Sequence, residues 1–278
     1  MNKVLVTGAT GFIGNYIIHE LCSRKNVHVI AAGRNQSKLS LLNQEYNIET
    51  MHFDIYERKD DWYTYTNKPD ILIHLAWDEL SDYKNLEHLE KILVKHYIFI
   101  KNIIKNGLKQ VSITGTCFEY GLQEGGLYED LLTMPVTAYG LAKDTLHKAL
   151  NILQFEHKFK LQWMRLFYVF GKGQNPKSLL SSLEKAIKSG DNVFNMSGGN
   201  QLRDFVHAEK AAELIVDNVL NNNSRRIYNI CSGTPISVRE LIEDRINELN
   251  SNISLNFGYY PYPDYEPMSF WGKNRCLS

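Results

Sequence analysis

Tyr139 and Lys143 stand four residues apart, a spacing that suits proton transfer. In a helix these two positions share one face, so the phenol and the ammonium group would lie side by side. A free phenol has a pKa of about 10, and a nearby positive charge lowers that pKa toward neutral pH. We therefore predict Tyr139 as a general acid–base and Lys143 as the group that tunes it. The same spacing arises by chance in many helices, so the prediction depends on the surrounding sequence.

Three glycines near the start of the chain predict a site for a pyrophosphate. Gly8, Gly11 and Gly14 belong to the string TGATGFIG, which follows a strand-like run and precedes a helical pattern. Glycine suits a turn with positive φ, close approach of the backbone to a pyrophosphate, and close packing of the helix on the sheet. The free N–H groups at the helix N-terminus would then bind the phosphates. The position of the string, directly after the first strand, predicts a bound dinucleotide.

The ends of the second and third strands bear on which dinucleotide binds. An acidic residue at the end of the second strand would bind the adenosine ribose 2′-hydroxyl and favour NAD. This chain has Arg34 there instead, and a guanidinium group suits a 2′-phosphate. We therefore predict NADPH, with NADH as the alternative if Arg34 only stacks on the adenine or stays solvated. Asp54, at the end of the third strand, is placed to reach the adenine amino group.

The elements that position these side chains alternate between strands and helices. Strand-like runs cover 4–7, 27–32, 49–53, 71–75, 110–114 and 161–167, and helical patterns cover 13–25, 97–106 and 138–155. This alternation predicts an α/β fold, a doubly wound parallel sheet with both faces covered. Beyond 170 the pattern loosens into helices at 179–189, 209–220 and 238–249, short strands, and a proline- and tyrosine-rich segment. We expect a dinucleotide-binding domain over 1–170 and a smaller C-terminal substrate lobe over 171–278, from which 205–235 returns to the first domain.

Composition excludes several classes of protein. The 278 residues carry 31 basic and 31 acidic side chains, so the chain lacks the positive field on which nucleic-acid binders rely. No apolar run is long enough for a membrane span, and the first strand starts at once, so we expect a cytoplasmic protein. The four cysteines, Cys22, Cys117, Cys231 and Cys276, are far apart and form no CxxC pair. We therefore expect neither a metal site nor a disulfide.

Taken together, the motifs resemble those of the extended short-chain dehydrogenase/reductases, the nucleotide-sugar epimerase/dehydratase superfamily. The matching strings are TGATGFIG (7–14), IHLA (73–76), GTCFEYG (115–121), YGLAK (139–143), RLFYVFGKGQ (165–174) and RDFVH (203–207). The resemblance implies a Rossmann fold with a small C-terminal lobe, a nucleotide-sugar substrate, and a homodimer formed through the helices that contain Tyr97 and Tyr139. It also implies that Thr116, or else Thr114, holds the substrate oxygen beside Tyr139, and that Arg203 binds the diphosphate.

The motifs and the resemblance together give a set of expected contacts. The expected cofactor contacts are Gly8, Thr10, Gly11, Phe12, Ile13, Gly14, Arg34, Asp54, Ile55, Leu75, Ala76, Trp77, Thr114, Tyr139, Lys143 and Phe167. The expected substrate contacts are Thr116, Cys117, Glu119, Tyr168, Lys177, Ser178, Arg203, Tyr262 and Glu266, with Asp264 as a further candidate and Phe270 and Trp271 as core residues.

Departures from the superfamily's pattern reduce the number of reactions that this chain is expected to catalyse. Its 4,6-dehydratases carry Asp-Glu where this chain has Cys117-Phe118, which disfavours dehydration. Its double epimerase-reductases use a His shortly after the position of Phe167, and none occurs here before Phe205. Tyr168 replaces an Asn at the diphosphate site, and His207 is interpreted as a packing residue. What remains is a single hydride transfer, which the nicotinamide supplies and the protein orients.

The resulting hypothesis is reduction of a 4-keto-6-deoxy sugar nucleotide by NAD(P)H. The sequence resembles bacterial surface-polysaccharide ketoreductases of the dTDP-fucose-forming and CDP-abequose synthase types. An epimerase that retains NAD, and a CDP- or GDP-linked ketoreductase, are the alternatives. A non-catalytic nucleotide-sensing module is a more remote one, because such a module has no need of Tyr139 and Lys143.

Overall fold

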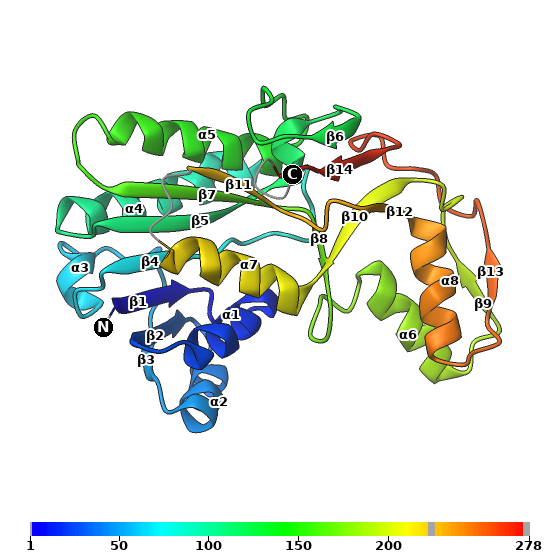
Figure 1. Ribbon diagram of the computed structural model, residues 1–278, viewed down its shortest axis with the longest axis horizontal. Helices are drawn as coiled ribbons and strands as arrows, with labels where there is room; N and C mark the ends of the chain where they lie inside the picture. Colours follow the sequence, from blue (N-terminus) through cyan, green and yellow to red (C-terminus); the bar gives the residue numbers. More distant parts are fainter. Residues whose placement is uncertain (1, 222–225, 275–278) are drawn as a thin grey trace.

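Seven parallel strands form the main sheet of this protein, in the order β11-β7-β5-β4-β1-β2-β3 (Figure 1). The computed structural model describes residues 2–221 and 226–274. From β1 the chain adds β2 and β3 on one side of the sheet, and then β4, β5, β7 and β11 on the other. The predicted doubly wound α/β fold is therefore confirmed. The strands are β1 (Asn2–Thr7), β2 (Val27–Gly33), β3 (Glu49–His52), β4 (Ile71–His74), β5 (Gln110–Thr116), β7 (Lys160–Leu166) and β11 (Ile227–Ile230).

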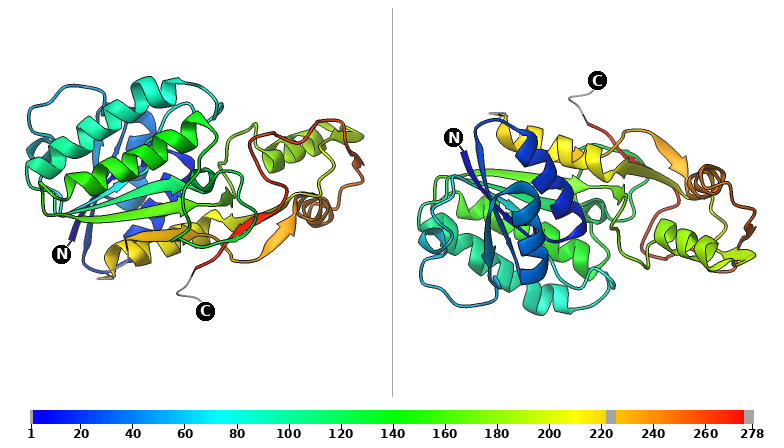
Figure 2. Two further views of the ribbon diagram at one scale, coloured as in Figure 1. Left: turned by 90° about the horizontal axis from the view of Figure 1, so that it is seen from above. Right: turned by 90° about the horizontal axis from the view of Figure 1, so that it is seen from below.

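Helices cover both faces of this sheet because successive strand residues point to opposite sides. Val4 and Val6 pack in one core cluster, whereas Leu5 between them packs in the other. The first cluster lies under α1 (Phe12–Ser23), α2 (Gln36–Tyr46) and α7 (Ala208–Leu220). The second lies under α3 (Trp62–Tyr65), α4 (Leu93–Lys105) and α5 (Ala138–Leu153) (Figure 2).

Three helices differ from the sequence prediction, and one of them, the four-residue α3, was not expected. The helix expected over 97–106 begins earlier, because a π-helical turn at His88–Ile92 runs directly into α4. The helix α2 was not expected, since only Leu39 and Leu42 of its eleven residues are buried and its apolar pattern is weak. Its ends are set by Asn35, whose side chain accepts a hydrogen bond from the Lys38 N–H, and by Asn47 in a left-handed conformation.

The second lobe is built from small sheets and two helices (Figure 1). Strands β8 (Tyr168–Phe170), β10 (Leu202–His207) and β12 (Pro235–Ser237) form one sheet, and β9 (Val193–Asn195) pairs with β13 (Ser254–Asn256). Helices α6 (Leu179–Ser189) and α8 (Val238–Glu248) share a small apolar core centred on Leu183 and Ile242. Between β10 and β12 the chain contributes α7 and β11 to the main domain. At the start of α7 the side chain of His207 accepts a hydrogen bond from the Glu209 N–H.

The C-terminal segment returns toward the main domain. Strand β14 (Phe270–Gly272) pairs with β6 (Gly125–Leu127), which follows a short 3-10 helix at Cys117–Tyr120. Phe270 packs in a buried cluster with Tyr120 and Phe167. This return places the segment before β14 beside the carboxyl end of β5, where the functional residues gather.

Candidate active site

The loop between β1 and α1 is shaped to receive a pyrophosphate. Gly8 has φ of +76°, and a Cβ added there would lie 2.8 Å from the backbone nitrogen of Ala76. A Cβ at Gly14 would collide with the carbonyl oxygen of Gly8, so a side chain there would push the helix off the loop. Gly11 is the N-cap of α1 and provides no capping side chain, which leaves the first N–H groups free for a ligand. The loop therefore fits the phosphates of a dinucleotide.

A cavity of about 770 Å³ extends from this loop along the carboxyl ends of the strands. Its size and its place at the point where the strand order reverses suit a dinucleotide. Fifteen of the sixteen expected cofactor contacts line it: Gly8, Thr10, Gly11, Phe12, Ile13, Gly14, Arg34, Asp54, Ile55, Leu75, Ala76, Trp77, Thr114, Tyr139 and Lys143. The lining also includes residues that were not predicted, among them Asn35, Gln36, Phe53, Asp78, Leu80, His96, Gly115 and Leu166.

Phe167 is the sixteenth, and its expected place is corrected by the structure. The Phe167 ring is buried against Tyr120 and Phe270, with ring centres 6.5 and 6.2 Å away. Its neighbour Leu166 lines the cavity instead, because adjacent residues at the end of an extended strand point in opposite directions.

At the adenosine end of the cavity, Arg34 is already paired. Its Nη2 lies 2.5 Å from the Asp78 Oδ1, and its Nη1 lies 4.0 Å from the Asp54 Oδ2. Asp78 follows β4, so its carboxylate projects from the carboxyl edge of the sheet, where ligands of such folds bind. The position of Asp78 shortly after a predicted strand is the feature of the sequence that could have identified it.

Tyr139 and Lys143 both lie in the first two turns of α5, which begins where Thr137 caps it. The Thr137 hydroxyl accepts a hydrogen bond of 3.1 Å from the Gly140 N–H. Lys143 is buried, and its Nζ donates a hydrogen bond of 2.8 Å to the carbonyl oxygen of Thr114. The same Nζ lies 4.0 Å from the centre of the Trp77 ring and 5.9 Å from that of Tyr139.

The expected electrostatic relation between these two residues is corrected. Burial raises the pKa of Tyr139, and a hydrogen bond with Thr116 lowers it only in part. Burial also lowers the pKa of Lys143 to about 7, so near neutral pH the positive charge that was expected to act on the phenol is itself only partly present. Within this chain, the removal of water from the site therefore outweighs the attraction between the phenolate and the ammonium group.

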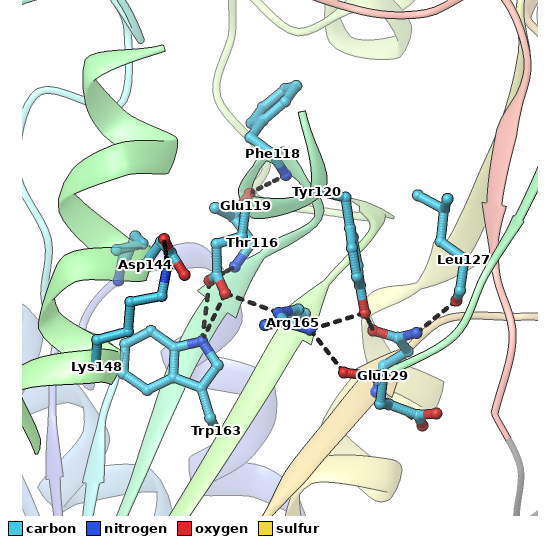
Figure 3. Close-up of polar contacts among 12 residues, drawn as sticks. Thr116, Phe118, Glu119, Tyr120, Leu127, Glu129, Asp144, Lys148, Trp163 and Arg165 are labelled. Carbon is cyan, nitrogen blue, oxygen red and sulfur yellow. Dashed lines mark hydrogen bonds and ion pairs between the residues drawn. The ribbon is translucent and has the colours of Figure 1, made fainter. Parts of the chain in front are cut away.

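Thr116 and Glu119 hold the segment that follows β5, as Figure 3 shows. The Thr116 hydroxyl accepts a hydrogen bond from the Phe118 N–H, and the Glu119 carboxylate accepts one of 2.9 Å from the Thr116 N–H. Glu119 is fully buried and also accepts hydrogen bonds from Trp163 Nε1 and Arg165 Nε, the latter at 2.7 Å. The prediction of Glu119 as a substrate contact is therefore wrong, because its oxygens are occupied by groups of the protein itself.

Aromatic side chains cover Tyr139. The ring of Tyr83 stacks on it with centres 5.3 Å apart, and its backbone oxygen accepts a hydrogen bond of 3.0 Å from the Tyr139 N–H. Phe118 and Tyr265 contact the Tyr83 ring in turn, at 4.9 and 6.3 Å. Tyr139 thus lies between the dinucleotide cavity and an aromatic layer formed by two loops and the 3-10 helix.

Four of the expected substrate contacts meet beside this layer. Arg203 is buried, its Nη2 lies 2.8 Å from the Glu266 Oε2, and its guanidinium lies 4.6 Å from the centre of the Phe270 ring. The Arg203 guanidinium also lies 5.8 Å from the centre of the Tyr168 ring. Burial raises the pKa of Tyr168 and of Cys117, and the Glu266 carboxylate raises both further.

Other expected substrate contacts lie away from Arg203 and Glu266. Lys177 and Ser178 precede α6, where the Ser178 hydroxyl donates a hydrogen bond to the Ser181 hydroxyl. The Tyr262 hydroxyl lies against Gly198 in the second lobe, and Asp264 is exposed and pairs with Lys84 at 2.7 Å. None of these residues lines the dinucleotide cavity.

Two absences within the described residues concern metal binding and membrane insertion. No group of three or more His, Cys, Asp or Glu side chains there could hold a metal ion. No helix in that part of the chain has the length and apolar character to cross a membrane. Of the four cysteines considered above, Cys276 lies outside the described residues.

Comparison with known proteins agrees with this geometry. The sequence model of the NAD dependent epimerase/dehydratase family matches residues 4–231. The dTDP-6-deoxy-L-talose 4-dehydrogenase (NAD(+)) of Aggregatibacter actinomycetemcomitans is 28% identical, over 97% of this chain and 99% of its own. The dTDP-4-dehydro-6-deoxyglucose reductase of Escherichia coli is 23% identical, over 92% of this chain and 84% of its own.

Solved structures share the fold. The UDP-glucuronic acid 4-epimerase from Bacillus cereus, in complex with UDP-glucuronic acid and NAD, superimposes with a TM-score of 0.83 at 21% identity, covering 98% of this chain and 90% of the epimerase. A UDP-N-acetylglucosamine 4-epimerase from Methanobrevibacter ruminantium gives the same score, with 99% and 90% covered. The family match spans most of the chain and agrees with the resemblance inferred from the motifs. The chain belongs to the NAD dependent epimerase/dehydratase family of nucleotide-sugar enzymes.

Proposed function

We propose that this protein reduces the C4 carbonyl of a 4-keto-6-deoxy sugar nucleotide and serves in the synthesis of surface-polysaccharide precursors. The observation that carries the proposal is that Tyr139 and Lys143 lie together in the wall of the dinucleotide cavity, with the Lys143 Nζ 5.9 Å from the centre of the Tyr139 ring. Two relatives add support, since the names of both describe redox chemistry at C4 of a dTDP-6-deoxy sugar. A 4-dehydrogenase and a 4-ketoreductase catalyse the same hydride transfer in opposite directions.

Three residues have separate roles in the proposed reduction. A bound nicotinamide supplies the hydride that reaches C4. The Thr116 hydroxyl holds the carbonyl oxygen, and Tyr139 transfers its phenolic proton to that oxygen as negative charge develops there. Because burial keeps the phenol protonated, Tyr139 holds the proton that reduction requires. Lys143 fixes the inner end of the cavity through its hydrogen bond to the carbonyl oxygen of Thr114.

Arg203 is the residue proposed to bind the diphosphate. In this structure its charge is balanced by Glu266, and both side chains are largely buried. A phosphate would compete with the Glu266 carboxylate for the same guanidinium N–H groups. We therefore propose that binding of the substrate moves Glu266 away from Arg203.

The choice between NADH and NADPH rests on Arg34. The sequence favours NADPH, because a guanidinium replaces the usual acid. The structure adds that Asp78 and Asp54 face this guanidinium, and two carboxylates repel a 2′-phosphate. This arrangement, together with the name of the dTDP-6-deoxy-L-talose 4-dehydrogenase (NAD(+)), supports NADH as the preferred reductant.

The proposal is tested by following NADH and NADPH oxidation with dTDP-4-dehydro-6-deoxyglucose, and NAD⁺ reduction with dTDP-6-deoxy-L-talose, with products identified by NMR. We expect turnover with at least one of the two substrates. Tyr139→Phe should lower kcat by about 10²–10⁴-fold while NADH still binds. Tyr259→Phe, which changes an exposed tyrosine, should leave kcat unchanged. Thr116→Ser should retain more activity than Thr116→Val, because it keeps the hydroxyl.

The main alternative gives a different result. An epimerase of this family would retain NAD tightly through purification and would show no net redox turnover. A protein isolated with bound NAD that interconverts two sugar nucleotides would overturn the reductase proposal. If the protein turns over a CDP- or GDP-linked 4-keto sugar in preference to the dTDP-linked one, only the nucleotide of the proposed substrate changes. Binding of a sugar nucleotide with no turnover at all would favour a nucleotide-sensing role.

A further inference from the structure

A chain of three hydrogen-bonded side chains runs from β1 through β4 to α4. The Thr7 Oγ1 lies 2.7 Å from the His74 Nδ1, and the His74 Nε2 lies 2.7 Å from the His96 Nδ1. Thr7, His74 and His96 are all buried. Thr7 and His96 also line the dinucleotide cavity, so both ends of the chain lie at its wall.

The last atom of this chain has no partner. The His96 Nε2 is buried and makes no hydrogen bond to any residue that the structure describes. Polar atoms in such a position are rare in native proteins, because a buried polar atom without a partner is destabilising. The ring of His96 packs against Trp77, with centres 4.6 Å apart, and meets that of Tyr56 edge-on at 6.0 Å. These rings hold the imidazole in one orientation at the cavity wall.

Both imidazoles are neutral at physiological pH. Burial lowers the pKa of His74 to about 3, and burial together with the nearby His74, Lys143 and Arg34 lowers the pKa of His96 well below its ordinary value. A neutral imidazole has one N–H and one bare nitrogen, so each hydrogen bond along the chain has a donor and an acceptor. The direction of the first bond therefore fixes the direction of the second.

Thr7 sets that direction. Among the described residues, its hydroxyl has His74 as its hydrogen-bond partner. If the hydroxyl donates to the His74 Nδ1, then the His74 Nε2–H donates to the His96 Nδ1, and only the His96 Nε2–H is left without a partner. If the direction is reversed, a buried hydroxyl proton and a bare His96 Nε2 are both left unpaired. The first arrangement leaves fewer unsatisfied groups and is favoured.

We propose that His96 is a cofactor-positioning residue, whose Nε2–H donates a hydrogen bond to an oxygen of the bound dinucleotide, with its tautomer set by Thr7 through His74. The oxygen is a ribose hydroxyl or a phosphoryl oxygen, because the dinucleotide presents both as acceptors along the cavity. The inference rests on the proposed dinucleotide cofactor and not on the identity of the sugar. No motif in the sequence marks His96, which is the fourth residue of the amphipathic helix α4.

The first test reads the tautomers directly. Protein labelled with ¹⁵N in its histidines is compared by two-dimensional NMR with and without NADH. We expect His74 and His96 both to carry their proton on Nε2, and the His96 Nε2 signal to shift when NADH binds. Thr7→Val should remove this preference and give a mixture of tautomers at His74. A His96 with a bare Nε2, or an Nε2 signal that does not move on saturation with NADH, overturns the proposal.

The second test measures NADH affinity by calorimetry. His96→Phe keeps an aromatic ring but has no donor, and we expect its Kd to rise by about 3- to 10-fold. His96→Gln, which can place an N–H near the same point, should lie closer to the wild type. The control is His147→Phe, a change of another buried histidine that stacks on Trp163 and does not line the cavity. Equal Kd values for the wild type and His96→Phe overturn the proposal and leave the proposed function intact. If the wild type binds neither NADH nor NADPH, the result overturns both the role of His96 and the proposed function.

Discussion

The ammonium group of Lys143 lies 4.0 Å from the centre of the Trp77 ring, in a place from which water is almost entirely excluded. A cation–π contact compensates for only part of the lost hydration, since such contacts contribute up to about 2 kcal/mol. The remaining penalty lowers the pKa of Lys143 to about 7. A residue placed here for function therefore reduces the stability of the fold.

This relation predicts how stability depends on pH. In the unfolded chain a lysine has a pKa of about 10.4, whereas in the folded protein the value is about 7. Between these values the unfolded state binds more protons, so the contribution of Lys143 to the free energy of unfolding rises with pH. The free-energy cost of burying the Lys143 ammonium group therefore destabilises the fold fully below about pH 7 and disappears above about pH 10.

Lys143→Met should therefore be more stable than the wild type at pH 7, by on the order of a few kcal/mol, and the difference should shrink as pH rises to 10. Urea unfolding at several pH values measures it. Lys185→Met, which removes an exposed lysine of α6, serves as the control and should show no such trend. A stability difference between Lys143→Met and the wild type that does not change with pH would contradict the lowered pKa.

Glu119 is predicted to act in folding and not in substrate binding. Glu119→Ala would leave the buried Arg165 without its carboxylate partner, which destabilises proteins by about 3–5 kcal/mol. The expected result is a lower urea midpoint. The matched control is Glu124→Ala, at an exposed position of the following loop, which should change stability by less than about 0.5 kcal/mol. An unchanged midpoint combined with weaker substrate binding would restore Glu119 as a substrate contact.

Asp78 is predicted to set the preference between the two dinucleotides. Asp78→Asn removes one of the two carboxylates that face Arg34, so the guanidinium becomes available to a 2′-phosphate. We expect the ratio of kcat/KM for NADPH to that for NADH to rise, on the order of tenfold. Glu79→Gln makes the same change of charge at the next, exposed residue and should leave the ratio unchanged. If both variants keep the wild-type ratio, Asp78 has no part in the choice.

The homodimer expected from the family resemblance can be tested at α4 and α5, which lie side by side on one face of the sheet (Figure 2). Ile98 on α4 and Ile152 on α5 are 56% and 65% exposed, which is unusual for isoleucine. Ile98→Glu should shift the protein from dimer to monomer in sedimentation velocity. Leu41→Glu, on the opposite face of the sheet, should not. A wild-type protein that sediments as a monomer at micromolar concentration would contradict the prediction.

The sequence predicts those parts of the site that depend on local spacing. The glycines of the phosphate loop and the pair Tyr139 and Lys143 carry their geometry within a few residues, and the cavity is lined by them as expected. Glu119 could not be understood in this way, because its partners Trp163 and Arg165 lie on β7, more than forty residues further along. The pKa values of Tyr139 and Lys143 likewise depend on burial by distant segments.

The order in which the chain enters the main sheet has a consequence for synthesis on the ribosome. Strand β7 ends at Leu166, but its second neighbour, β11, begins only at Ile227, after β8, α6, β9 and β10 of the second lobe have been made. Until then the edge of β7 is open, and until α7 has been made the apolar face that this helix covers is exposed to water. A nascent chain of this protein must pass through a state able to pair with other unfinished chains, and a pause in translation before α7 would prolong it.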